Sequence, residues 1–207
     1  MGYLAAGEFE SYGLPAGTSG DWVTAATALI NSYCRRPDLN VMQFQERLRV
    51  AVGSQTVRLS YLPLTALGGV GSPLLSVEGR YGKPRRGEFV EAGLMEIATV
   101  FSLPGEWSVL DPAAVDFAAE TGELTLPWNV LGLPFNEVRV TYTGGLAVIG
   151  DDVKSACAQI VRNAQAQPAL NVSRSRVDTL QMEYFSGSLL DETVKAWLRP
   201  YVAQRLG

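Results

Sequence analysis

Apolar residues recur every three or four positions, the spacing of an amphipathic helix, in two stretches that lie far apart in the chain. The first stretch runs from Asp21 to Arg36 and stops at Pro37, which cannot continue a helix. Its apolar stripe consists of Trp22, Ala26, Leu29, Ile30 and Tyr33. The second stretch begins with Asp151 and Asp152, whose carboxylates can cap the first turn, and it ends by Pro168. We therefore predict one helix in each stretch.

Between these two helices the pattern changes to alternation, the two-residue period of a half-buried strand. The clearest case has Val138, Val140 and Tyr142 on one face and ends at the pair Gly144 and Gly145. Further strands are predicted over residues 57–61 and 94–101, and a hairpin over residues 114–118 and 124–126. The region between the helices is therefore expected to form four to six antiparallel strands.

Beyond Pro168 the chain predicts a short strand over residues 180–184 and then a last helix. Ser188 and Asp191 match a capping box at the start of this helix, and Pro200 must kink or divide it. Its apolar stripe consists of Val194, Trp197, Leu198, Tyr201 and Val202. Aromatic residues in such a helix favour either core packing or contact with a partner.

These elements predict an α+β fold in which a small helical bundle carries an inserted antiparallel β domain. The bundle is built from residues 21–36, 151–167 and 188–206. The first 20 residues are glycine-rich and weakly patterned, which indicates an arm or a loop ahead of the first helix. The predicted domains are an N-terminal arm, 1–20, a helical domain, 21–40 and 146–207, and an inserted β domain, 41–145.

The absence of histidine from the 207 residues excludes Ser-His and Cys-His nucleophile pairs and the usual zinc, copper and non-haem iron sites. The Gly82-Lys83 pair is followed by Pro84, where a phosphate-binding loop needs Ser or Thr. Cys34 and Cys157 resemble neither a disulfide framework nor a metal site, and we interpret them as buried thiols in a reducing cytoplasm. We therefore predict no catalytic residue, no metal site and no bound cofactor.

Carboxylates around the predicted hairpin leave one enzymatic alternative open. They are Asp111, Asp116, Glu120 and Glu123. Paired carboxylates could line the cleft of a small hydrolase, whereas acidic residues in a turn more often solvate it and cap its backbone. We expect the second role and keep a carboxylate-dependent hydrolase as the alternative.

The net charge of −4 is mild, and no basic surface dominates, so tight non-specific binding of nucleic acid is not expected. One basic loop carries Lys83, Arg85 and Arg86, which could be solvated or could contact a partner. The sequence has no apolar run of 18 residues and no basic and then hydrophobic leader. We therefore predict neither membrane insertion nor secretion.

The segment DWVTAATALINSYCRRP, from Asp21, resembles the first helix of phage head-tail connector (adaptor) proteins of the gp6-like family, which ends in a Tyr-Cys-x-Arg-Pro-like sequence. VRVTYTGGLAVIGDDVKSACAQIV, from Val138, is similar to the family's strand, acidic cap and following helix. The hairpin DFAAETGELTLP, from Asp116, resembles the family as well.

The resemblance implies a structural protein that forms a homo-oligomeric ring, commonly of twelve copies, between the portal of a double-stranded DNA phage and the stopper or tail protein. DNA passes through such a ring without sequence-specific binding, and no membrane is involved. The expected location is the neck of the virion, after synthesis in the host cytoplasm. On this interpretation the portal-docking residues are Trp197, Leu198, Tyr201 and Val202. Two predicted hairpin tips, near residues 66–74 and 80–88, face the tail-side partner, and the second carries Lys83, Arg85 and Arg86. A neck or tail-completion protein from another assembly step is a further alternative.

Overall fold

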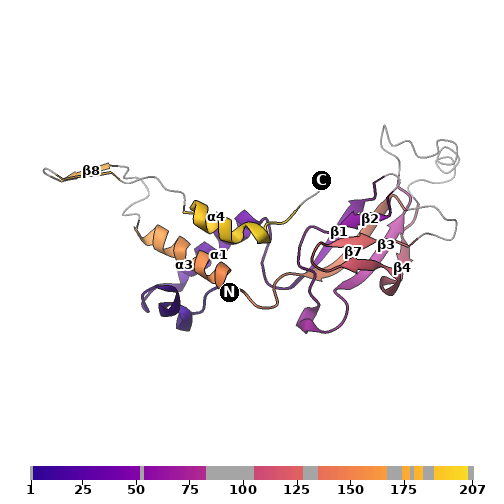
Figure 1. Cartoon of the computed structure of the whole chain (residues 1–207), viewed down its shortest axis with the longest axis horizontal. Coiled ribbons are helices and arrows are strands. Elements are labelled where there is room, and N and C mark those ends of the chain that lie inside the picture. Colours follow the sequence, from indigo (N-terminus) through magenta and orange to yellow (C-terminus); the bar gives the residue numbers. More distant parts are fainter. Residues whose placement is uncertain are drawn as a thin grey trace. The chain divides into compact units, whose positions relative to one another are not determined.

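The computed structural model describes residues 2–51, 54–82, 105–127, 135–166, 174–177, 180–183 and 189–204. The chain divides into two compact units (Figure 1). The helical unit consists of Met1–Leu39 and Val148–Val202, and the β unit consists of Asn40–Ala147 and Ala203–Gly207. Helices and antiparallel sheets in the described part of the chain make this an α+β fold, as predicted.

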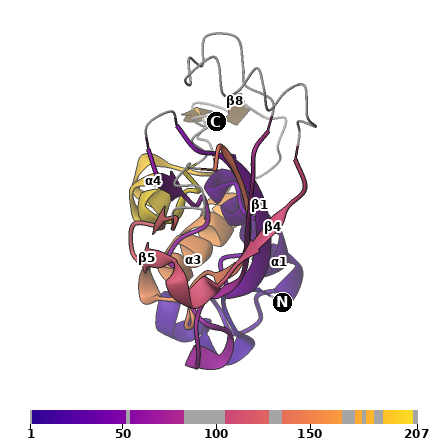
Figure 2. The ribbon, with the colours of Figure 1, turned by 90° about the vertical axis from the view of Figure 1, so that its right-hand side faces the viewer.

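Three helices lie together in the helical unit: α1 (Gly20–Cys34), α3 (Asp151–Ala166) and α4 (Glu192–Leu198). α3 packs against both α1 and α4 (Figures 1 and 2). The carboxylate of Asp191 caps α4 by accepting a hydrogen bond from the Val194 amide at 2.7 Å. α4 stops two residues before Pro200, and the chain continues as a 3-10 turn at Arg199–Tyr201. The predicted division of the last helix at Pro200 is confirmed.

α1 buries a different face from the predicted one. Its buried residues are Val23, Ala26, Thr27, Ile30 and Cys34. Trp22, which was expected in the stripe, is 44% exposed. Ala26 and Ile30 belong to both sets, but consecutive positions differ by about 100° around a helix, so two overlapping stripes can point in different directions. The structure selects the stripe that contains Val23 and Cys34.

The first residues pack into the helical unit and are not the separate arm that the sequence predicted. Two 3-10 turns occupy this segment, at Ala6–Glu8 and Glu10–Tyr12. Four of its apolar side chains are buried: Tyr3, Leu4, Phe9 and Leu14. The ammonium group of Lys154, on α3, pairs with the Glu8 carboxylate at 2.5 Å. The prediction of an arm was wrong because these irregularly spaced apolar residues occupy core positions without forming a long helix.

The described residues of the β unit form two antiparallel sheets, and the larger has the strand order β1-β7-β3-β4. Its strands are β1 (Met42–Arg49), β7 (Glu137–Gly144), β3 (Leu74–Arg80) and β4 (Ser108–Leu110). The smaller sheet, of order β2-β6-β5, has the strands β2 (Thr56–Arg58), β6 (Glu123–Thr125) and β5 (Asp116–Ala118). The predicted strand at residues 138–143 and the predicted hairpin, now β5 and β6, are confirmed.

One apolar core contains side chains from both sheets. Its members include Phe44, Val57, Val77, Leu124, Val138, Val140 and Tyr142. Glu46 is the charged exception on this side of β1, and it accepts hydrogen bonds from the hydroxyls of Tyr142 and Ser60, the latter at 2.8 Å. Because side chains alternate along a strand, the opposite face of the larger sheet carries polar residues. Asn40 and Leu146 form an isolated parallel bridge where the chain enters and leaves the unit.

A small hairpin precedes α4 and consists of β8 (Arg174–Val177) and β9 (Leu180–Glu183). The sequence predicted the second of these strands and missed the first. The strand predicted over residues 94–101 and Ser188 of the predicted capping box lie outside the described residues. Within the described ranges, every helix is too short or too polar to cross a membrane.

Cys34 and Cys157 are buried free thiols, as predicted. Burial raises the pKa of each thiol to about 11, so little reactive thiolate exists near neutral pH. We expect the folded protein to react only slowly with a chromogenic disulfide reagent, and both thiols to react at once after unfolding in urea. Release of the coloured thiolate measures this. Rapid reaction before urea is added would show that the helical unit opens readily.

Candidate interaction surfaces

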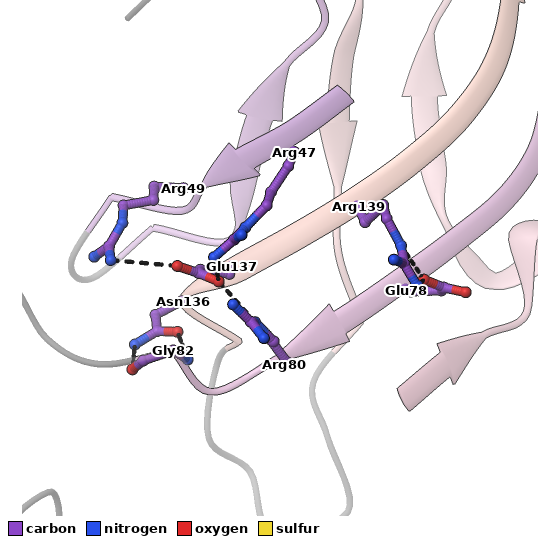
Figure 3. A network of polar contacts seen from close by, with 8 residues as sticks. All are labelled: Arg47, Arg49, Glu78, Arg80, Gly82, Asn136, Glu137 and Arg139. Atoms are coloured by element: carbon purple, nitrogen blue, oxygen red, sulfur yellow. Dashed lines mark hydrogen bonds and ion pairs between the residues drawn. The ribbon is translucent and has the colours of Figure 1, made fainter. Parts of the chain in front are cut away.

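The polar face of the larger sheet gathers charged residues from three strands, with an indole beside them. Its members are Arg47 and Arg49 on β1, Glu137 and Arg139 on β7, Glu78 and Arg80 on β3, and Trp107 just before β4. The strand register places Arg49 and Arg80 on either side of Glu137. We call this set the arginine face, and Figure 3 shows its ion pairs.

Glu137 is the buried centre of the arginine face, with a side chain only 4% exposed. One carboxylate oxygen, Oε2, accepts from Arg80 Nε at 2.7 Å and from Arg47 Nη2 at 2.8 Å (Figure 3). The other oxygen, Oε1, pairs with Arg49 Nη2 at 3.2 Å. Burial by itself would raise the pKa of Glu137, but the hydrogen bonds and charges of Arg80 and Arg47 outweigh it and hold this pKa below its usual range. The carboxylate therefore stays charged and holds three strands together.

A second contact fixes the backbone at the edge of the arginine face. Asn136 precedes β7, and its side-chain amide donates to the Gly82 carbonyl at 2.9 Å (Figure 3). The Gly82 amide donates back to Asn136 Oδ1 at 2.5 Å. This reciprocal pair joins the start of β7 to the end of β3. The arginines that flank Glu137 are consequently held on a fixed scaffold.

Trp107 brings three guanidinium groups together. The guanidinium carbons of Arg80, Arg139 and Arg47 lie 4.5, 4.8 and 5.8 Å from the centroid of its ring. Cations at such distances are attracted to the electron-rich face of an indole. Arg139 also pairs with Glu78. Four arginines against two glutamates leave the face with an excess of two positive charges, and Arg47, at 57% exposure, presents much of that charge to solvent.

Large apolar side chains are exposed on both units. On the helical unit they are Trp22, Val148 and Trp197, and on the β unit they are Leu67, Val70, Leu75 and Val109. Leu67 opens a 3-10 turn at Leu67–Gly69, in a loop that the sequence predicted as a hairpin tip, and Val70 just after it is 84% exposed. Exposed apolar side chains of this size are suited to docking.

The predicted portal-docking residues do not share one surface. Trp197 is 36% exposed and can contact a partner, whereas Leu198 has no exposed surface and belongs to the core. Tyr201 is half-buried and donates a hydrogen bond to Asp152 at the start of α3. Val202 is half-buried as well. The prediction for Leu198 was wrong, because consecutive helix positions point in directions about 100° apart and α4 turns Leu198 inward.

The predicted tail-side residues Lys83, Arg85 and Arg86 lie outside the described residues. The hairpin carboxylates are described. Asp111 caps a 3-10 turn by accepting from the Ala113 amide at 3.0 Å, the capping role that the sequence favoured. Among the residues that the structure describes, no three His, Cys, Asp or Glu side chains gather as a metal site.

Comparison with known proteins gives no assignment. No family model matches the chain, and no curated protein matches it. The functional argument therefore depends on the residues of this chain and on the surfaces that they form.

Proposed function

We propose that this chain is a structural head-to-tail adaptor of a tailed double-stranded DNA phage. Several copies form a ring between the portal and the stopper or tail protein, and DNA passes through the ring without sequence-specific contacts. The chain connects its neighbours and catalyses nothing. It is made in the host cytoplasm and becomes part of the neck of the virion.

The observation that carries this proposal is that each unit exposes large apolar side chains of its own, with Val148 and Trp197 on the helical unit and Leu67 and Val70 on the β unit. A connector must hold at least two neighbours at once. The exposed apolar side chains on the two units are candidates for these contacts, because buried apolar and aromatic contacts dominate stable interfaces.

The sequence segments that resemble the adaptor family support the same proposal. They coincide with whole elements: α1, the hairpin of β5 and β6, and the continuous run from β7 to α3. In that run, β7 belongs to the β unit and α3 to the helical unit. The resemblance therefore spans both units.

Replacing Trp197 with serine should weaken binding to the portal by about thirtyfold, the effect of losing an aromatic anchor worth about 2 kcal/mol. The fold should survive, since this indole is 36% exposed. Co-sedimentation of the full chain with portal rings of the same phage measures the affinity. Trp22→Ser is the matched control, because it removes an exposed indole from α1 and lies outside the C-terminal segment.

Unchanged binding by Trp197→Ser would show that the C-terminal segment is not the docking element. Equal loss in both variants would show that the effect is not specific to that segment. Negative-stain images of the wild-type chain mixed with portal rings test the wider proposal. Extra ring density stacked on the portal supports an adaptor. If the chain does not bind the portal but binds the end of an isolated tail, it is a tail-completion protein instead.

A further inference from the structure

The hairpin of β5 and β6 presents an acidic surface. Asp116 and Glu123 lie on the same exposed face, because Phe117 and Leu124 between them point to the opposite side, where Leu124 is buried. Glu120, in the connecting turn, is exposed as well. Arg58 is the cross-strand neighbour of Glu123 on this face. Three carboxylates against one guanidinium leave an excess of two negative charges.

This acidic surface matches the arginine face in amount of charge and is opposite in sign. The two cannot meet within one copy. The apolar core includes Val77 and Val140 of the larger sheet with Val57 and Leu124 of the smaller, so the sheets turn their apolar faces to that core. The arginine face is the other face of the larger sheet, directed away from the hairpin. Contact between the two surfaces therefore requires two copies of the chain.

We propose that the arginine face of one copy binds the acidic hairpin of the next copy around the ring. The inference rests on the proposed function and adds to it the surface through which the chain associates with itself. Such a contact is heterologous: each copy uses one patch toward one neighbour and a different patch toward the other. Contacts of this kind close into a ring when the rotation between copies allows it.

The chemistry of the arginine face suits a carboxylate-bearing segment. Arg47 is more than half exposed, and its guanidinium is held by Glu137 and by the ring of Trp107. A planar guanidinium fixed in this way can receive a second carboxylate with little loss of side-chain freedom. Val109, on β4, is directly opposite Glu78 in the register and is largely exposed, so it adds apolar area to the same face. Arginine and tryptophan are the residues enriched at interface anchors.

A protein segment fits this face better than nucleic acid does. Glu78 and Glu137 lie among the four arginines and neutralise half of their charge. Binding to a phosphate backbone gains most from several uncompensated cations, each of which releases a counterion. The arginine face has only two excess positive charges, and they lie beside Trp107 and Val109. An acidic hairpin with two excess negative charges balances them.

Disulfide cross-linking in the full chain tests the contact. One cysteine replaces Gln45, which shares the exposed face of β1 with Arg47, and another replaces Ala118, the exposed neighbour of Glu123 across the hairpin. These changes keep every charge of both surfaces. Cys34 and Cys157 can stay, because they are buried. Mild oxidation of concentrated protein should give a ladder of dimers, trimers and larger species on a non-reducing gel.

Charge reversal makes the test specific. Arg47→Glu should reduce the ladder at least about tenfold, and adding Asp116→Arg should restore most of it, because complementary charges then face each other again. Arg199→Glu, at an exposed site of the helical unit, is the matched control for the change in net charge and should leave the ladder intact. A second control moves the hairpin cysteine to exposed Ser32 and should give no ladder.

Three results would overturn the inference: no ladder at any protein concentration, products that stop at dimers, or no rescue by the paired charge reversal. Dimers alone would indicate a symmetric contact.

Fluorescence anisotropy with a short DNA duplex tests whether the arginine face binds nucleic acid instead. If the chain bound the duplex, gave no ladder, and lost duplex binding in Arg47→Glu, the face would be assigned to nucleic acid. Rings stacked on the portal without cross-links would refute only this inference. Cross-links without portal binding would refute only the adaptor proposal.

Discussion

Replacing Glu137 with glutamine should lower the free energy of unfolding of the β unit by about 3 kcal/mol, because it leaves a set of arginines without their shared counter-charge. Arg80 is the most buried of them, with a side chain 15% exposed. Arg47 can turn toward water, which keeps the expected cost at the low end for a broken buried ion pair. Urea unfolding, followed through hydrogen exchange of the β7 amides, measures the change.

Glu78→Gln is the matched control, since it neutralises a more exposed carboxylate whose ion-pair partner among the described residues is Arg139. Its cost should stay below about 1 kcal/mol. If both variants lost the same free energy of unfolding, Glu137 would contribute no more to stability than the more exposed Glu78. If Glu137→Gln were as stable as the wild type, hydrogen bonds from residue 137 to the arginines would be enough to stabilise the β unit without a negative charge.

The stabilisation by Glu137 should also depend on pH in one direction. Its pKa is lower in the folded chain than the ordinary carboxyl value of 4.5, so its contribution is complete above that value. The contribution disappears as the pH falls through the lowered pKa, where the folded carboxylate finally takes up a proton. The difference between the wild type and Glu137→Gln should therefore shrink in acid. A difference that grew in acid would contradict the assigned direction.

Replacing Leu198 with alanine should destabilise the helical unit by about 3 kcal/mol, the usual cost of a cavity at a fully buried leucine. The neighbouring change, Trp197→Ser, should cost less than about 1 kcal/mol because that indole is partly exposed. Only Trp197→Ser should weaken binding to the portal more than it destabilises the fold. The pair separates packing from docking within two consecutive residues.

Hydrogen exchange of the α3 and α4 amides is the suitable measurement, because two units need not unfold in one step. The amides of β7, in the β unit, provide the internal reference and should exchange as in the wild type. Exchange that accelerated equally in both units after Leu198→Ala would show that they unfold together. Unchanged exchange in α3 would contradict the placement of Leu198 in the core.

Elements with a strong local pattern could be predicted from the sequence. α3 has an uninterrupted apolar stripe after two acidic residues, and β7 alternates along its length. β1 was missed although Met42, Phe44 and Leu48 keep the two-residue period. Glu46 interrupts that period, and only the structure shows that Tyr142 and Ser60 satisfy it. A partly buried carboxylate of this kind resembles an exposed residue in the sequence.

The arginine face could not be predicted because it depends on strand register. Arg47 and Glu137 are 90 positions apart, and Arg80 and Glu137 are 57 apart. Each arginine by itself looks like an ordinary solvated residue of a half-exposed strand. Sequence analysis directed attention instead to Lys83, Arg85 and Arg86, where three basic residues are close in the chain. Local clustering is visible in a sequence, and clustering across strands is not.

The bridge between Asn40 and Leu146 has a consequence for how such a chain can diversify. A segment whose two ends lie side by side can be lengthened, shortened or replaced with little effect on the helices that flank it, as in successful domain insertions. The β unit is therefore a module that related chains could exchange to suit another neighbour. An exchanged β unit would also have to provide contacts for the C-terminal residues of the chain. Ala203 is buried, and the Gln204 amide donates to the Ser60 carbonyl at 3.3 Å.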